Sequence, residues 1–139
     1  MTKIKTPDAN GTTVDKETDP KQIARQFMEL VIAGKIDDAY KKYVSSNGKH
    51  HNAYFREGFQ ALQEAMKENH LQFPNKQFTI EHVISDGELV AIHSHIVLRQ
   101  GEAGMAAIHL SRFQGNKIVE MWDIGEPIPA DSPNQDGVF

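Results

Sequence analysis

Apolar side chains between Asp19 and about residue 69 recur at intervals of three and four residues, which is the spacing of an amphipathic helix. Asp19 can cap the first helix, and Pro20 fits its first position, because that position needs no backbone N–H donor. Gly34 can adopt the left-handed backbone conformation that commonly ends a helix. The pattern therefore predicts helices over about 20–33, 36–43 and about 56–69, with a loop over 45–48 after the second helix.

From Pro74 onward the period of the apolar residues changes to two, which is the spacing of a half-buried strand. Residues 85–88, Ser-Asp-Gly-Glu, carry the signal of a type I′ hairpin turn, and the returning strand is predicted over 89–98. Two further connections containing Gly then separate the following strands. Helices followed by an antiparallel meander predict an α+β domain over 19–139.

Residues 1–18 are rich in Thr, Asp, Lys, Gly and Pro and show no apolar period, so we expect a flexible N-terminal arm there. The 139 residues fit one domain, which is able to bury about two thirds of the surface of the unfolded chain. At the other end, the loop-like tail closes with the apolar residues Val138 and Phe139. A purely solvated tail would not need them, so we expect this tail to be ordered.

Charge and composition exclude several classes of partner. The net charge is −4 and the basic residues are scattered rather than clustered beside aromatic ones, which disfavours nucleic acid. No apolar stretch approaches the roughly 18 residues that a bilayer span needs, and the first residues lack the apolar segment of a signal peptide. We therefore expect a soluble protein without a membrane partner, with the cytoplasm as its default location. The absence of cysteine excludes disulfides and thiolate chemistry.

Polar side chains interrupt the apolar runs of the last third of the chain. His93 and His95 lie in AIHSHIVL, His109 lies in MAAIHLSRF, and the pair Trp122 and Asp123 lies in GNKIVEMWDIGEPIP. Burying a carboxylate or several imidazoles without partners costs several kcal/mol, so such groups are usually paired, bound to metal or exposed to a ligand pocket. Asp123 and His109 are therefore the principal candidates for chemistry.

Several stretches together carry a family resemblance. HHN after two helices, FPN before the sheet, GELVAIHSH, RFQGNKIVEMWD and the ending DSPNQDGVF resemble the SnoaL-like branch of the nuclear transport factor two superfamily over about residues 19–139. The resemblance implies a cone-shaped α+β fold, in which a bent antiparallel sheet wraps around helices and leaves a deep pocket for a small-molecule ligand. Members include polyketide cyclases, which close a ring by intramolecular aldol condensation, and relatives that form homodimers through the outer face of the sheet.

The resemblance also implies roles for two residues. In the family's cyclases an aspartate on the last strand is the acid/base, and a histidine fourteen positions earlier contacts it; Asp123 and His109 stand at that spacing. An apolar pocket raises the pKa of a carboxyl group above about 3.9, which suits a base acting beside a carbonyl, and His109 serves better as a neutral partner or donor. Ala107 stands where the cyclases carry an amide, which removes one polar contact to a polyketide.

The register of the last hairpin decides whether these two residues meet. A symmetric hairpin around Gly115-Asn116 pairs His109 with Trp122 and leaves Asp123 on the other face of the sheet. A one-residue bulge brings His109 and Asp123 to the same face. In the alternative, Trp122 fills the core and Asp123 ends the strand.

The remaining candidates are donors or aromatic residues that could contact a ligand. His93 and His95 face one side of their strand, either as pocket donors or on a solvent face, and with His109 they could complete a three-histidine metal site. The stretch containing His51 and Asn52 leads into the third helix near the mouth of the implied cone, where it could bind a ligand or only form a turn. The predicted ligand-binding residues are His51, Asn52, His93, His95, Trp122, Tyr40 and Phe55.

Three hypotheses of function follow. The first is an enzyme without a cofactor, whose Asp123 performs acid/base chemistry of the aldol-condensation or isomerase type on a small carbonyl compound. The second is a non-catalytic ligand-binding or dimerisation module of the same fold. The third is a metal-dependent enzyme that uses the three histidines. A homodimer formed through the outer face of the sheet is expected in each, because helices on one side leave apolar strands uncovered on the other.

Overall fold

The computed structural model of the chain describes residues 5–7, 13–15 and 19–139. Its helices are α1 (Pro20–Ile32), α2 (Ile36–Tyr43) and α3 (Phe59–Gln72). A carboxylate oxygen of Asp19 accepts a hydrogen bond from the backbone N–H of Lys21 at 3.1 Å, which confirms the predicted cap of α1. The first two helices lie where the pattern places them, whereas α3 begins and ends about three residues later than predicted.

The predicted N-terminal arm, residues 1–18, falls largely outside the described residues. Its two described pieces, β1 (Lys5–Pro7) and β2 (Thr13–Asp15), pair with each other as short antiparallel strands. The division of the chain into an arm and a domain over 19–139 stays a prediction.

A five-stranded sheet forms the body of the fold, in the order β3-β7-β6-β5-β4. The predicted meander is confirmed by the last four strands, which pair antiparallel with their neighbours in the chain. Their bounds are β4 (Gln77–Asp86), β5 (Leu89–Val97), β6 (Met105–Gln114) and β7 (Lys117–Pro127).

Two local predictions are wrong. The residues expected to form a loop over 45–48 lie within the edge strand β3 (Val44–His50), which pairs in parallel with β7. Ser45, Ser46 and Asn47 carry polar side chains, and only the two ends of the strand are buried. The sequence of this strand therefore shows no apolar alternation. In the β4–β5 turn only Gly87 has a positive φ, 58°, which fits a type II′ turn, whereas type I′ requires a positive φ at both central residues.

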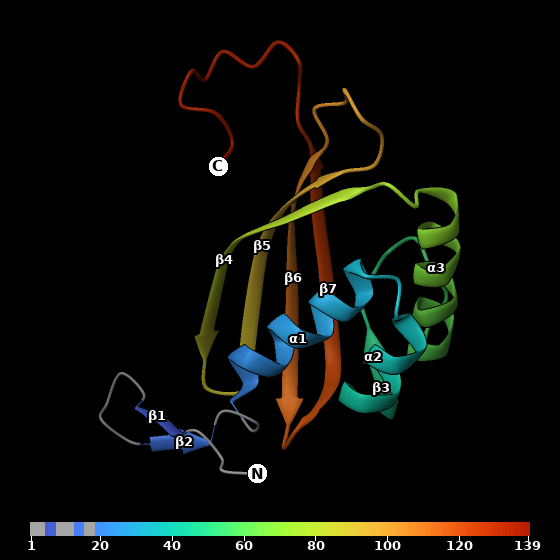
Figure 1. The fold of residues 1–139 in the computed structure, drawn as a ribbon, viewed down its shortest axis with the longest axis vertical. Coiled ribbons are helices and arrows are strands. Elements are labelled where there is room, and N and C mark those ends of the chain that lie inside the picture. The colour runs from blue at the N-terminus through green and yellow to red at the C-terminus, as the bar shows by residue number, and fades with distance from the viewer. Residues whose placement is uncertain (1–4, 8–12, 16–18) are drawn as a thin grey trace.

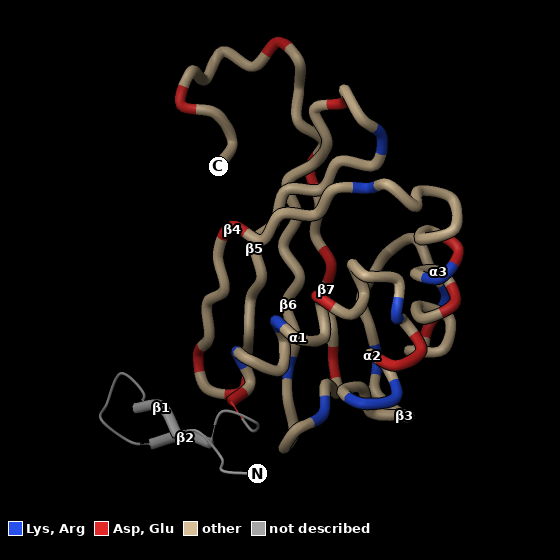
Figure 2. Tube along the Cα trace, in the orientation of Figure 1, with Lys and Arg blue, Asp and Glu red and all other residues tan. Residues whose placement is uncertain are grey.

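The helices cover one face of the sheet, here called the inner face, as Figure 1 shows. Inner-facing residues of the strands, such as Val90, Ile92 and Phe113, are almost fully buried and form one core with α1 and α2. The opposite, outer face keeps large apolar side chains exposed, including Ile84 at 63% and Ile124 at 66%. Figure 2 shows that charges of both signs are dispersed over the helices and the strands. No helix of the described residues is long and apolar enough to span a bilayer.

A bulge in β7 sets the orientation of its second half. Phe113 pairs with Ile118, but the next pair is Arg112 with Glu120, so Val119 is an extra residue on β7. Beyond the bulge His109 pairs with Asp123 and Leu110 pairs with Trp122. The bulged alternative of the two predicted registers is therefore the one that the structure adopts.

The C-terminal tail is placed against the outer face of the sheet. The ring of Phe139 lies 4.7 Å from the imidazole of His95 and 5.3 Å from that of His93, centroid to centroid. The end of the tail thus contacts β5, and the order expected for the whole tail stays a prediction.

The bulge is packed against a glycine on the neighbouring strand. A Cβ atom at Gly48 would overlap both the backbone carbonyl oxygen of Val119 and the ring of Phe59. A Cβ atom at Gly125, farther along β7, would lie at an ordinary distance of 3.5 Å from the side chain of Met105.

We predict that Gly48→Ala lowers the free energy of unfolding by about 1–3 kcal/mol, because the added methyl group pushes β3 away from the bulge. Gly125→Ala, the matched control on the sheet, should change it by much less. Urea unfolding of the two variants measures the difference. Equal stability of both would contradict the close approach at Gly48.

Candidate functional site

A cavity of about 290 Å³ lies between the inner face of the sheet and the helices. Most of its wall is apolar, contributed by residues such as Phe27, Met66, Phe78 and Met105. The lining residues that carry polar groups are Tyr40, Asn69, Lys76, His109 and Asp123. The cavity is thus an apolar space with few polar contacts, as ligand sites usually are.

Asp123 enters the cavity from β7 and is held by a residue from the segment after β3. Its Oδ2 atom accepts a hydrogen bond of 2.9 Å from the Nδ2 amide of Asn52. Asn52 is itself held, because its Oδ1 accepts from the backbone N–H of Tyr54 at 3.0 Å, and its own N–H donates to Nδ1 of His50 at 3.2 Å. Since Nδ1 of His50 is the acceptor, its Nε2 donates to the carbonyl of Arg56, 2.7 Å away. One oxygen of Asp123 is therefore fixed by a chain of neutral hydrogen bonds.

His109 faces the other oxygen of Asp123 across the β6–β7 pair. The distance from His109 Nε2 to Asp123 Oδ1 is 3.9 Å, which is too long for a hydrogen bond. Within the described part of the chain, the buried Nδ1 of His109 has no hydrogen-bond partner. Burial lowers the pKa of His109, and the negative charge of Asp123 opposes this only in part. His109 is therefore neutral near pH 7.

Tyr40 contributes a third polar group to the cavity wall, next to these two. Burial and the charge of Asp123 raise the pKa of its phenol, so the hydroxyl stays protonated and can donate a hydrogen bond. Its ring packs edge-on against Phe27 at 5.5 Å between centroids. Tyr40 and Phe55, two of the residues predicted to bind a ligand, both line the cavity.

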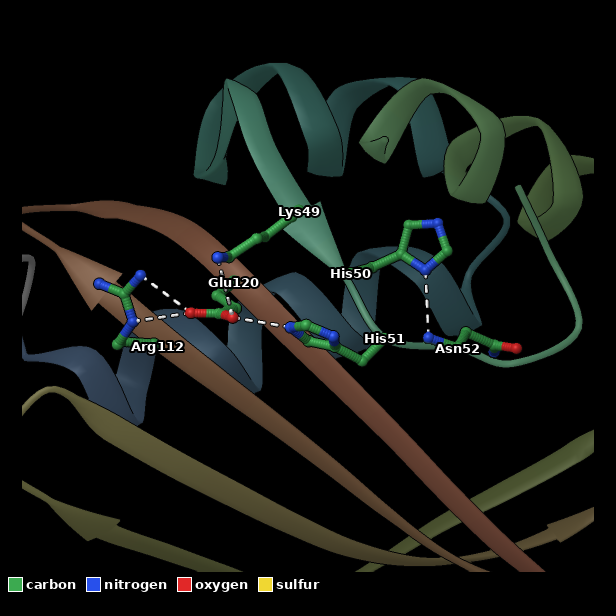
Figure 3. A network of polar contacts seen from close by, with 6 residues as sticks. All are labelled: Lys49, His50, His51, Asn52, Arg112 and Glu120. Carbon is green, nitrogen blue, oxygen red and sulfur yellow. Dashed lines mark hydrogen bonds and ion pairs between the residues drawn. The ribbon is translucent and has the colours of Figure 1, made fainter. Parts of the chain in front are cut away.

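A polar network on the outer face, drawn in Figure 3, surrounds the carboxylate of Glu120. Its Oε2 lies 2.7 Å from Nε2 of His51, and its Oε1 accepts bonds of 3.1 and 3.0 Å from Nε and Nη2 of Arg112. Lys49 lies 3.8 Å away. The bond to His51 and those from Arg112 hold the pKa of Glu120 below its usual range. The network ties β3, β6 and β7 together beside the bulge.

Four predicted ligand-binding residues lie on the outer face, away from the cavity. His51 stacks on Trp122, with ring centroids 5.1 Å apart, because the bulge turns Trp122 outward. His93 and His95 share a face of β5, and their neighbours are His82 and Phe139.

The structure therefore separates the three histidines of the metal-site hypothesis, since His109 faces inward. Among residues 5–7, 13–15 and 19–139, no group of three or more His, Cys, Asp or Glu side chains is arranged to hold a metal ion.

Asn69, Lys76 and His50 were not predicted as parts of the site. The first two line the cavity from the end of α3 and the segment before β4, and His50 orients Asn52. The sequence FPNK before the sheet is the one signal near Lys76, and it carries no spacing that indicates a site.

The largely buried imidazole of His109 should make stability depend on pH. In the unfolded chain its pKa returns to about 6.5, whereas burial lowers it in the folded protein. The unfolded state then binds more protons, so the contribution of His109 is fully present above about pH 6.5 and is lost as the pH falls through the lower folded-state pKa.

We predict that the free energy of unfolding falls between pH 7 and pH 5, and that it falls less in His109→Gln. His82→Gln, which removes an exposed histidine of the outer face, is the control and should keep the dependence of the parent. Thermal or urea unfolding of the parent and of both variants across this pH range measures the dependence. The same dependence in His109→Gln and the parent would count against a neutral His109.

Comparison with known proteins identifies the family. Residues 24–121 match the SnoaL-like domain. The chain therefore belongs to the SnoaL-like family. No curated protein matches it in sequence.

Solved structures share the fold at low sequence identity. An NTF2-like protein of unknown function from Cytophaga hutchinsonii is 15% identical, with 79% of this chain and 92% of that chain covered and a TM-score of 0.65. A SnoaL-like polyketide cyclase from Agrobacterium tumefaciens is 15% identical, with 77% and 91% covered and a TM-score of 0.63. An uncharacterized cystatin fold protein from Novosphingobium aromaticivorans is 16% identical, with 76% and 97% covered and a TM-score of 0.65. The predicted cone-shaped, NTF2-like α+β fold is confirmed.

Proposed function

We propose that this SnoaL-like protein is a cofactor-independent enzyme that moves a proton beside the carbonyl group of a small molecule. The observation that carries the proposal is the juxtaposition of Asp123 and a neutral His109 in the wall of an apolar cavity. Acid/base groups that are positioned in this way typically contribute on the order of 10² to 10⁴ in rate.

Asp123 is the base in this proposal. Asn52 holds Oδ2, so the carboxylate keeps one orientation, and Oδ1 is the oxygen nearer to His109. The gap of 3.9 Å between Oδ1 and Nε2 of His109 leaves the two groups free to contact different atoms of one ligand. Oδ1 takes the proton from the carbon next to the carbonyl, the electron pair of the broken C–H bond forms the C=C bond of an enolate, and the π electrons of the carbonyl move onto its oxygen.

His109 and Tyr40 are donors to the enolate oxygen that forms. In an apolar cavity, a donor that is already in place stabilises developing charge more than water does. The proton on Asp123 then returns to the substrate. It goes to the alkoxide formed when the enolate carbon attacks a second carbonyl, as in an aldol condensation, or to a different carbon, as in an isomerisation.

The volume of the cavity restricts the substrate to a small molecule. About 290 Å³ is at the lower end of the range of ligand pockets. Ala107 is buried and small, so no amide extends toward a ligand from that position. A small aliphatic or monocyclic carbonyl compound fits these limits better than a polycyclic polyketide.

Proton exchange tests this function without knowledge of the natural substrate. We predict that the protein accelerates deuterium incorporation beside the carbonyl of 2-octanone in D₂O, followed by NMR. Asp123→Asn keeps the shape of the side chain but removes the base, and should lower the accelerated rate at least 100-fold. Asp86→Asn, at an exposed turn, is the matched control and should keep the rate.

Undiminished exchange by Asp123→Asn would refute the assignment of the base. Binding of the ketone without any accelerated exchange would favour the non-catalytic module.

We also propose that two copies of the chain associate through their outer sheet faces. The exposed Ile84 and Ile124 project from this face, beside Leu89 and Trp122. A monomer would leave these apolar side chains in water, whereas a symmetric dimer covers them.

Sedimentation velocity at micromolar concentration should therefore show a dimer. Ile124→Lys places a charge in the contact and should shift the protein to monomer. Leu71→Lys alters an apolar side chain of α3 that is 80% exposed, and it should leave the dimer intact. A parent protein that sediments as a monomer would exclude this association.

A further inference from the structure

The cavity has a second polar region, formed by Lys76 and Asn69, for which the proposed acid/base chemistry has no use. We propose that Lys76 binds a carboxylate of the ligand, so that the substrate is a small oxo acid with an apolar chain between its ketone and its carboxylate. This inference rests on the proposed function for the ketone end and adds the class of substrate.

Lys76 is held in place by its surroundings. Its Nζ donates a hydrogen bond of 2.6 Å to Oδ1 of Asn69 on α3. Backbone hydrogen bonds also fix the chain around it. The N–H of Lys76 donates to the carbonyl oxygen of Phe73 at 3.2 Å, and the N–H of Phe73 donates to the carbonyl oxygen of Asn69 at 2.9 Å. The ammonium group is thus positioned at the cavity wall and does not sweep freely through solvent.

The charge of Lys76 is not compensated within the described part of the chain. Burial lowers the pKa of its ammonium group, because the charged form loses contact with water. Asn69 supplies a neutral acceptor, and no carboxylate of the described residues lies within 4.0 Å of the ammonium group. The other cation at this end, Arg99 over the ring of Phe73, is already 3.4 Å from Glu102. A partly desolvated cation beside an apolar cavity is a suitable partner for an anionic group of a ligand.

The position of Lys76 relative to His109 sets the shape of the ligand. Phe78, two residues after Lys76, packs against the imidazole of His109 with centroids 5.8 Å apart. Lys76 directly precedes β4, and Phe78 lines the same cavity from that strand, so its ring contributes apolar wall next to both polar regions. Ile96, which pairs with Phe78 across β4 and β5, and Leu98, just after β5, also line the cavity. A ligand that reaches both regions therefore needs an apolar middle.

A purely structural role for Lys76 is the alternative. The ammonium group lies beside the end of α3, where a positive charge interacts favourably with the helix dipole. This role predicts an effect of its replacement on stability but none on the choice between ligands.

A matched pair of probes separates the two roles. 2-Octanone and 7-oxooctanoate carry the same methyl ketone, but only the second carries a carboxylate. Isothermal titration calorimetry should show tighter binding of 7-oxooctanoate to the parent protein, by roughly 10- to 100-fold, as expected for a charge-assisted hydrogen bond. Lys76→Met should abolish this preference by weakening the binding of the oxo acid alone, and Lys76→Arg should retain most of it.

Controls keep the inference testable. Lys41→Met removes an exposed lysine of α2 and should leave the preference unchanged. If Lys76→Met fails to fold, Lys76→Gln takes its place, and Asn69→Ala should reduce the preference as well. Equal affinity of the parent for both probes, failure to bind either, or an unchanged preference in the Lys76 variants would overturn the inference.

The experiments distinguish failure of the oxo-acid inference from failure of the proposed acid/base function. Accelerated exchange that depends on Asp123, without any preference that depends on Lys76, would leave the proton chemistry standing and remove the oxo acid. A preference that depends on Lys76 without exchange would leave an anion-binding module.

Discussion

The single-residue bulge at Val119 is the constraint on which the candidate site depends. Side chains alternate between the two faces of a strand, so an extra residue before Glu120 reverses the face of every residue that follows. Asp123 turns into the cavity opposite His109, and Trp122 turns outward. Without the bulge the indole would point into the cavity and the carboxylate would lie outside, which would leave the imidazole without its acidic partner.

The register beyond the bulge is fixed from both faces of the sheet. On the outer face Glu120 bonds to His51, and on the inner face Asp123 bonds to Asn52. The two partners, His51 and Asn52, are consecutive residues that follow β3, so one short segment contacts both faces of the sheet. A slip of one residue would break both contacts at once and leave carboxylates without partners, which costs several kcal/mol. The polar network around Glu120 is therefore part of the structure that positions the inner site, although it does not line the cavity.

The helices and the meander could be predicted from the sequence because local spacing determines them. Strand β3 could not, since only Val44, Lys49 and His50 pair with β7, and the residues between them form an irregular stretch without apolar alternation. The bulge was recognised only as one of two registers, because contacts from the distant residues His51 and Asn52 select it. Lys76 was missed for a similar reason. A single lysine near a proline carries no pattern, and only the tertiary fold, in which Lys76 bonds to Asn69 of α3, brings it to the cavity.

Among the residues that the structure describes, no oppositely charged side chain neutralises Asp123 or Lys76 in the cavity. Asp123 receives its hydrogen bond from a neutral amide and faces an imidazole that burial keeps neutral. Lys76 is paired with a neutral amide as well, and no ion pair joins it to Asp123. An ammonium group in direct contact with the carboxylate would hold it in the ionised form and weaken it as a base. Keeping the cation at a separate part of an apolar cavity preserves the base and leaves the ammonium group for an anionic group on the ligand, which is why the proposed substrate combines a ketone with a carboxylate.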